Sequence, residues 1–280
     1  MMATIQLNGR DFVVDLEKPL EISIPLQFNG PQPNAYGVEP ARSTPVVAGD
    51  LVGDTRQGGS VNFEKYMFVP HCNGTHTECV GHVTHERISL LECLRDVFVP
   101  AVLVSVEPER IGDDLVVSKT GLLQRLEQAL TYVRATDTTE EHAKASTLNA
   151  LIVRTFPNAE RKLTREYGVY IPPYFTAEAM EYIVACGFKH LLVDMPSIDR
   201  IFDDGKLVNH RLFWNIESGS FETNAATRVN STITELIYVP NEIEDGEYLV
   251  NLQIAPFASD ASPSRPVLFK VERGHPCPRA

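Results

Sequence analysis

The pattern of apolar and polar residues along the chain predicts strands that alternate with helices. Two short runs, VFVPAVLVSV (97–106) and ALIVRTF (150–156), lack polar alternation, as strands buried on both faces do. Between them, apolar residues recur with the helical period over residues 120–135, so that one stripe covers a sheet face. A second helix is predicted between Thr176, a suitable N-cap, and Gly187, a suitable C-terminal cap. This alternation predicts an α/β protein.

The first 70 residues follow a different pattern. Asn8-Gly9 lies between two alternating runs and predicts a hairpin, so the chain is expected to start with antiparallel strands. Residues 29–54 are rich in Pro, Gly and Asn, and this segment is either a surface excursion or a wall of a substrate pocket, with Tyr36 as a weak pocket candidate. The run SVNFEKYMFVP (60–70) is expected to be a strand that leads directly to His71.

One stretch, PHCNGTHTECVGHVTH (70–85), concentrates side chains that bind metal ions. It contains four of the eight histidines and two of the five cysteines of the chain, together with Glu78. Imidazole, thiolate and carboxylate are the usual ligands of zinc and similar divalent ions, and an irregular loop with Gly74 and Gly81 could direct several of them to one point. The stretch contains neither HExxH nor paired CxxC motifs. A metal site of another kind is therefore predicted.

The spacing within this stretch also predicts which side chains point in the same direction. His76 and Glu78 are two positions apart, so they would project to the same side of an extended segment. A turn at Gly81 would bring His82 round toward them. The three side chains can therefore face one ion.

The length and net charge of the chain indicate its domain organisation and exclude some classes of binding partner. A chain of 280 residues with 43% hydrophobic composition can bury a full core and could form one large domain or two closely packed ones; we take residues 1–280 as a single domain. The net charge of −12 disfavours nucleic acid and anionic membrane surfaces as partners and favours a small-molecule substrate. Without a long apolar run, a signal-peptide pattern or a disulfide framework among five scattered cysteines, we expect a cytoplasmic protein.

The segment from Gly74 to His82, GTHTECVGH, resembles the signature of the cyclase / bacterial kynurenine formamidase family of metal-dependent hydrolases, His-x-Gly-Thr-His-x-Asp-x-Pro-x-His. In straight register the first His of the pattern falls on Cys72, and the Asp and Pro fall on Glu78 and Val80. A histidine stands one position earlier, at His71, where a one-residue bulge would present it. We take His71 as the first ligand, because imidazole suits an open hydrolytic site, and keep Cys72 as the alternative.

Later segments resemble the same family in the same order. DMPSID (194–199) matches a segment whose Asp194 and Asp199 either hold ligands by hydrogen bonds or make ordinary turns and caps. By resemblance, His210 in NHRLF serves the metal centre, and Glu235 in TITELIY ligates a second ion or bridges two. The turn SPSRP (262–266) resembles the closing turn of the family.

The resemblance implies a fold and an activity. The fold is the swivelling β/β/α type, a mixed sheet partly closed into a barrel with covering helices, in a homodimer or homotetramer. The implied activity is arylformamidase- or isatin hydrolase-like: hydrolysis of a C–N bond of a small aryl formamide or cyclic amide by a water that one or two Zn or Mn ions activate. His82 is expected to be catalytic, as the proton shuttle between nucleophile and leaving nitrogen. The alternatives are a non-catalytic metal or small-ligand binding protein, and a cyclase or dehydratase acting on a small carbonyl compound.

Overall fold

The computed structural model describes residues 1–136, 148–168 and 171–272, and it is built around a mixed sheet of eleven strands. Four parallel strands form the centre of this sheet, namely β9 (Phe98–Val106), β12 (Ala150–Thr155), β14 (His190–Val193) and β15 (Thr232–Glu235). Antiparallel strands extend it beyond β9, namely β16 (Gly246–Asn251), β18 (Val267–Glu272), β2 (Arg10–Asp15) and β1 (Met2–Leu7), with β3 (Leu20–Glu21) beside β18. Beyond β15 lie the antiparallel strands β8 (His76–Glu78) and β17 (Ala261–Pro263).

The mixed sheet with its helices confirms the predicted α/β class. The described strands run in one path from β1 to β17, and no pairing joins these two end strands, so the described sheet is not a closed barrel. Partial closure and the swivelling β/β/α type remain predictions. The predicted hairpin is present, because Asn8 and Gly9 connect β1 to β2 with positive φ angles of 53° and 78°.

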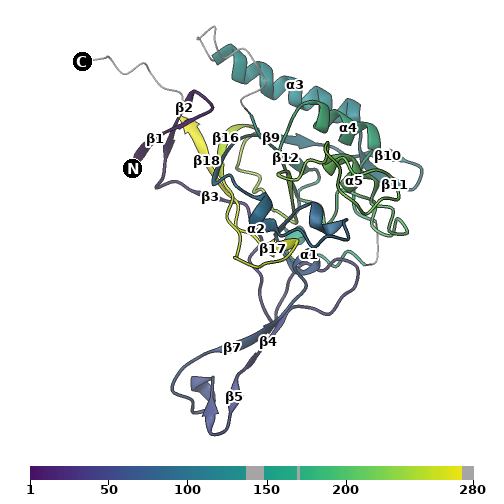
Figure 1. Ribbon diagram of the computed structural model, residues 1–280. Helices are drawn as coiled ribbons and strands as arrows, with labels where there is room; N and C mark the ends of the chain where they lie inside the picture. The colour runs from purple at the N-terminus through teal and green to yellow at the C-terminus, as the bar shows by residue number, and fades with distance from the viewer. Residues whose placement is uncertain (137–147, 169–170, 273–280) are drawn as a thin grey trace.

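Both faces of the central strands are buried, which explains the continuous apolar runs. Val102 and Val104 of β9 face one apolar cluster, whereas Ala101 and Leu103 face another. The first cluster is covered by α3 (Lys119–Thr136), α4 (Ala177–Ala185) and α5 (Val208–Trp214), and Figure 1 shows α3 and α4 together on one side of the sheet. The predicted cap is confirmed, since Thr176 Oγ1 accepts a hydrogen bond from the Ala179 amide at 3.3 Å.

The histidine-rich stretch is more regular than the sequence predicts. Residues 70–85 contain the one-turn helix α1 (Pro70–Asn73), strand β8 and a 3₁₀ turn at Val80–His82, so the prediction of an irregular loop is wrong. Gly74 has φ 176°, an extended backbone open to any residue. Gly81 is required by close packing, because a Cβ there would lie 2.1 Å from the Ile88 carbonyl oxygen.

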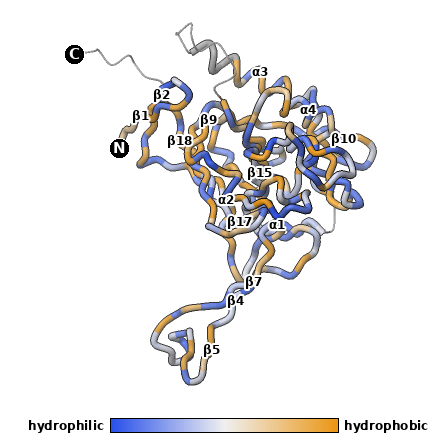
Figure 2. The backbone as a smooth tube through the Cα atoms, in the orientation of Figure 1, coloured by the Kyte–Doolittle hydropathy of each residue, from blue (hydrophilic) through white to orange (hydrophobic). Residues whose placement is uncertain are grey.

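A two-stranded arm precedes this stretch. Strands β4 (Arg42–Pro45) and β7 (Glu64–Met67) pair with each other, and β5 (Val47–Ala48) and β6 (Leu51–Val52) pair beyond them. Figure 1 shows the arm projecting from the body, so residues 42–54 of the Pro- and Gly-rich segment are a surface excursion, whereas residues 32–35 of that segment are buried. Figure 2 shows hydrophobic and hydrophilic stretches alternating along the arm. The strand that leads to His71 therefore exists, but it belongs to the arm and not to the main sheet.

The remaining elements are short. They are α2 (Leu90–Cys93), and a small sheet of β10 (Glu109–Ile111), β11 (Asp114–Val117) and β13 (Tyr174–Phe175). In the described part of the chain, no helix is sufficiently long and apolar to cross a membrane. The four cysteines within the described ranges are free, and Cys277 lies outside them.

Candidate metal centre

Strand β8 brings His76 and Glu78 to the same side of the sheet, as their spacing predicts. The strand lies between β15 and β17, and its register places His76 directly opposite Glu235. Directly opposed residues of antiparallel strands share a face, so the two side chains meet, with His76 Nε2 3.5 Å from Glu235 Oε2. Glu235 Oε1 also accepts a hydrogen bond from the Ile198 amide at 2.8 Å, which fixes the carboxylate.

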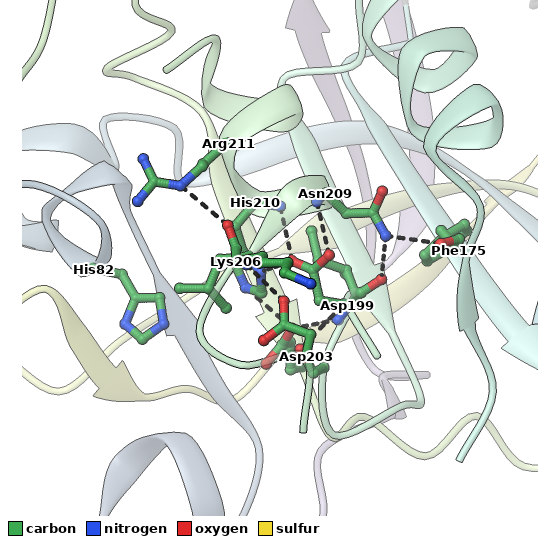
Figure 3. A network of polar contacts seen from close by, with 12 residues as sticks. His82, Phe175, Asp199, Asp203, Lys206, Asn209, His210 and Arg211 are labelled. Carbon is green, nitrogen blue, oxygen red and sulfur yellow. Dashed lines mark hydrogen bonds and ion pairs between the residues drawn. The ribbon is translucent and has the colours of Figure 1, made fainter. Parts of the chain in front are cut away.

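His210 enters the same place from the first turns of α5. The carboxylate of Asp199 accepts hydrogen bonds from the amides of Asn209 and His210 at 2.7 and 3.1 Å. It also accepts a 2.7 Å hydrogen bond from His210 Nδ1, which leaves Nε2 directed at Glu78 Oε1, 2.9 Å away. Figure 3 shows this arrangement, with Asp199 joined to His210 and Asn209 by dashed lines. Asp199 thus does both things that its motif suggested, because it caps α5 and orients the imidazole.

Two overlapping groups of ligand atoms result. The buried group consists of His76, Glu78 and Glu235, whose ligand atoms all lie within 4.8 Å of one another. The half-buried group consists of His71, Glu78 and His82, and it meets the same criterion. Glu78 belongs to both groups. Side chains from the middle and from the last third of the chain therefore meet at one point.

The half-buried group contains the histidines that reach toward solvent. His71 and His82 have side chains 26% exposed, and their rings stack with centroids 4.6 Å apart. Glu78 Oε2 lies 3.5 Å from His71 Nε2 and 3.8 Å from His82 Nδ1. His82 therefore contacts both solvent and the buried carboxylate of Glu78, a position that suits a proton carrier.

The carboxylates and imidazoles shift each other's pKa values. Burial alone would raise the pKa of Glu78, but His82, His210 and His71 outweigh it and hold that pKa far below its usual range. Burial alone would lower the pKa of His210, but Glu78 and Asp199 together raise it well above its usual value. The opposite shifts show that the charges of the carboxylates and the imidazoles stabilise each other.

The donor atoms suit a divalent cation. Seven buried side-chain atoms of the described residues have no hydrogen-bond partner, and three of them gather in the centre, namely His71 Nε2, His76 Nε2 and Glu78 Oε2. His76 Nδ1 donates a 3.0 Å hydrogen bond to the Gly74 carbonyl oxygen, which sets the tautomer whose Nε2 can bind a metal. Buried polar atoms are nearly always paired, so three unpaired atoms in one cluster indicate a partner that the chain itself does not supply.

The structure favours His71 over Cys72 as the candidate ligand. The Cys72 side chain packs in an apolar cluster with Ala35, Tyr167 and Leu236. Burial, with a contribution from the charge of Glu235, raises the pKa of the Cys72 thiol to about 11, so it resists forming a thiolate. A helical turn, and not the expected bulge, presents His71.

Two exposed aromatic side chains belong to residues with unusual backbone conformations. Tyr36 and Phe202 have positive φ angles of 59° and 63°, and their rings meet edge to face with centroids 6.0 Å apart. The Ala35 amide donates a 3.0 Å hydrogen bond to the Cys72 carbonyl oxygen, so Tyr36 follows a residue that is held against α1, the helix that carries His71.

Other motif residues have structural roles. Asp194 accepts hydrogen bonds from the amide and the hydroxyl of Thr155 and pairs with buried Lys162 at 2.8 Å. Arg154 donates to the carbonyl oxygens of Pro240 and Ile243, both at 2.8 Å. The two aspartates of DMPSID therefore have different roles: Asp194 pairs with residues in the core, and Asp199 holds His210 at the centre.

Asp260 is the residue that the sequence analysis missed. It lies directly before β17, and its Oδ2 is 3.1 Å from His71 Nε2 and 3.4 Å from His82 Nδ1. The only available signal was its position two residues before the SPSRP turn. A single aspartate in a loop carries no metal-binding pattern of its own.

Comparisons with known proteins agree with this architecture. The family model described as "Cyclase: Putative cyclase" matches residues 14–200, so the chain belongs to the cyclase family. Among curated proteins, none matches the sequence.

Solved structures with the same fold have low sequence identity to the chain. A predicted metal-dependent hydrolase from Bacillus stearothermophilus has a TM-score of 0.56 at 16% identity, covering 90% of this chain and 98% of its own. Isatin hydrolase A from Ralstonia solanacearum has a TM-score of 0.60 at 13% identity, with 91% and 92% coverage. An isatin hydrolase bound to thioisatinate also has a TM-score of 0.60 at 13% identity, with 91% and 93% coverage.

Proposed function

We propose that this chain is a metal-dependent hydrolase that cleaves a C–N bond of a small aryl formamide or cyclic amide. The observation that carries the proposal is the convergence of two imidazoles and one carboxylate with unpaired buried atoms, His71 Nε2, His76 Nε2 and Glu78 Oε2. Membership of the cyclase family and the likeness to isatin hydrolases support the same class.

The proposed ligands are residues from both halves of the chain. We assign one or two Zn or Mn ions to the side chains of His71, His76, Glu78, His210 and Glu235. Cys72 is left out because its thiol is buried among apolar side chains. Glu78 is the residue shared by both groups, so a single substitution there should affect every ion.

The chemistry follows from what these side chains can hold and move. A divalent ion bound here would lower the pKa of a bound water and polarise the substrate carbonyl. Asp199 fixes the proton of His210 on Nδ1, and Gly74 does the same for His76, so both rings present Nε2 to the centre. His82, half-buried beside Glu78 and Asp260, is assigned the transfer of a proton to the leaving nitrogen.

The substrate class is inferred from the surroundings of the centre. Tyr36 and Phe202 offer two aromatic rings in strained backbone conformations, a feature that clusters at functional sites. Aromatic side chains can stack against a planar aryl ring. An aryl formamide or a fused lactam fits this surface better than an aliphatic amide.

The proposal is tested by assaying the purified protein with added zinc or manganese against N-formylkynurenine, isatin and a panel of lactams. Hydrolysis should require metal and should be lost in Glu78→Gln. The matched control is Glu247→Gln, a change to a glutamate that pairs with Arg10 on the far part of the sheet. Stoichiometric metal binding with no turnover of any substrate would favour the non-catalytic binding protein instead.

A further inference from the structure

The carboxylate of Asp260 is held in place by its own loop. The Asp260 carbonyl oxygen accepts a 3.0 Å hydrogen bond from the Cys79 amide, which ties the loop to the end of β8. Ser259 Oγ donates a 3.0 Å hydrogen bond to Asp260 Oδ1. One carboxylate oxygen is therefore occupied by the loop, and the other, Oδ2, is the atom nearest the histidines.

The contact between Asp260 and His71 is close but is not a well-aligned hydrogen bond. Oδ2 lies 3.1 Å from His71 Nε2, nearer than the 3.5 Å that separates this nitrogen from Glu78 Oε2. Even so, His71 Nε2 has no hydrogen-bond partner of acceptable geometry. Both carboxylates therefore lie close to this nitrogen, and neither makes a hydrogen bond of acceptable geometry with it.

We propose that Asp260 is a metal ligand, which completes the set of His71 and Glu78 and leaves His82 free to carry protons. This inference rests on the proposed function, because it concerns the same metal centre. Two carboxylates and one imidazole would balance the charge of a divalent ion. The set of His71, His82 and Glu78 would leave a net positive charge in a partly buried position, which is costly.

The position of His82 supports this division of roles. Its Nδ1 is 3.4 Å from Asp260 Oδ2 and 3.8 Å from Glu78 Oε2, so it is farther from both carboxylates than His71 Nε2 is. A histidine next to a ligand carboxylate, but outside the ligand set, can accept and release protons without dissociating from an ion.

The test is calorimetric titration of the metal-stripped protein with MnCl₂ and, separately, ZnCl₂. Asp260→Asn should weaken binding of one ion at least about 10-fold, the minimum typical for disrupting a metal site. His82→Gln should bind as the wild type does, within about twofold. Asp96→Asn is the matched control, because Asp96 also lies 3.0 Å from a histidine, His190, away from the centre. Its metal affinity should be unchanged.

Asp260→Ser is a second variant, which keeps the backbone hydrogen bond to Cys79. It should weaken metal binding as Asp260→Asn does. Far-UV circular dichroism in EDTA checks that both variants are folded. Unchanged affinity in folded Asp260→Asn or Asp260→Ser would overturn the inference, and so would weakened binding in His82→Gln alone. If the wild type bound no ion, the proposed function itself would fail, a result distinct from either of these.

Discussion

His210 Nε2 lies 2.9 Å from Glu78 Oε1, although the two residues are 132 positions apart in the chain. The sheet produces this meeting, because β8 is inserted beside β15, and α5 follows the loop that leaves the carboxyl end of β14. Ligands of open α/β sheets bind outside the carboxyl ends of the strands. Glu235 is the last residue of β15, and Asp199 and His210 follow β14, so the candidate metal centre lies at the carboxyl ends of these strands.

His82→Ala should abolish turnover and leave the metal bound. His82 is the half-buried imidazole assigned to proton transfer, a function that contributes on the order of 10²–10⁴ to rates. The measurement is kcat together with metal content after dialysis. Loss of the metal in this variant would make His82 a ligand and would contradict its assigned role.

Asp199→Ala should weaken both the metal centre and the fold. The variant removes the acceptor of His210 Nδ1 and the cap of α5, so metal affinity should fall about 10- to 100-fold. The free energy of unfolding should fall by about 1–3 kcal/mol. Asp203→Asn is the control, because Asp203 bonds the amides of Gly205 and Leu207 in the same loop without touching His210. Equal metal affinities of the two variants would exclude the orienting role.

The metal-free protein should lose stability as the pH rises above neutrality. The pKa of His210 is higher in the folded protein than its usual 6.5, so protonated His210 stabilises the fold fully below about pH 6.5. This contribution disappears as the pH rises through the raised pKa. Urea unfolding in EDTA between pH 6 and 9 measures it, and His210→Gln should have a flatter profile. If the free energy of unfolding changed with pH equally in the wild type and in His210→Gln, the raised pKa of His210 would be contradicted.

Gly81→Ala should destabilise the protein far more than Gly74→Ala. A Cβ at Gly81 would lie 2.1 Å from the Ile88 carbonyl oxygen, whereas the nearest atom at Gly74 is 3.8 Å away, in Leu26. The turn that carries His82 must therefore shift in Gly81→Ala. Thermal unfolding midpoints test this difference, and similar midpoints would show that the turn can relax.

Much of the fold could be predicted from local patterns. Continuous apolar runs identified β9 and β12, and the Asn8-Gly9 pair identified the first hairpin, because these signals depend on neighbours in the sequence. The arm could not be separated from the main sheet in this way. The alternation in residues 60–70 is the same whether the strand pairs with β4 or with the central sheet.

The site was predictable where a motif fixed the spacing. His76 and Glu78 could be placed on one side of a strand from their separation alone, whereas His210 and Glu235 were found only through resemblance to the family. The choice between His71 and Cys72 depended on the turn of α1, which directs the thiol toward Tyr167 and Leu236. Asp260 had no local signal, since its loop becomes part of the centre only through pairing of β17 with β8.

The most direct test of the account is the metal content of the wild type and Glu78→Gln, measured by elemental analysis after loading with zinc or manganese and dialysis. Glu78 belongs to both ligand groups, so the wild type should retain one or two ions per chain and Glu78→Gln should lose them. Glu78→Asp should retain them in part, because it keeps the carboxylate. A wild type without bound metal, or a Glu78→Gln variant that retains the full content, would contradict the central claim.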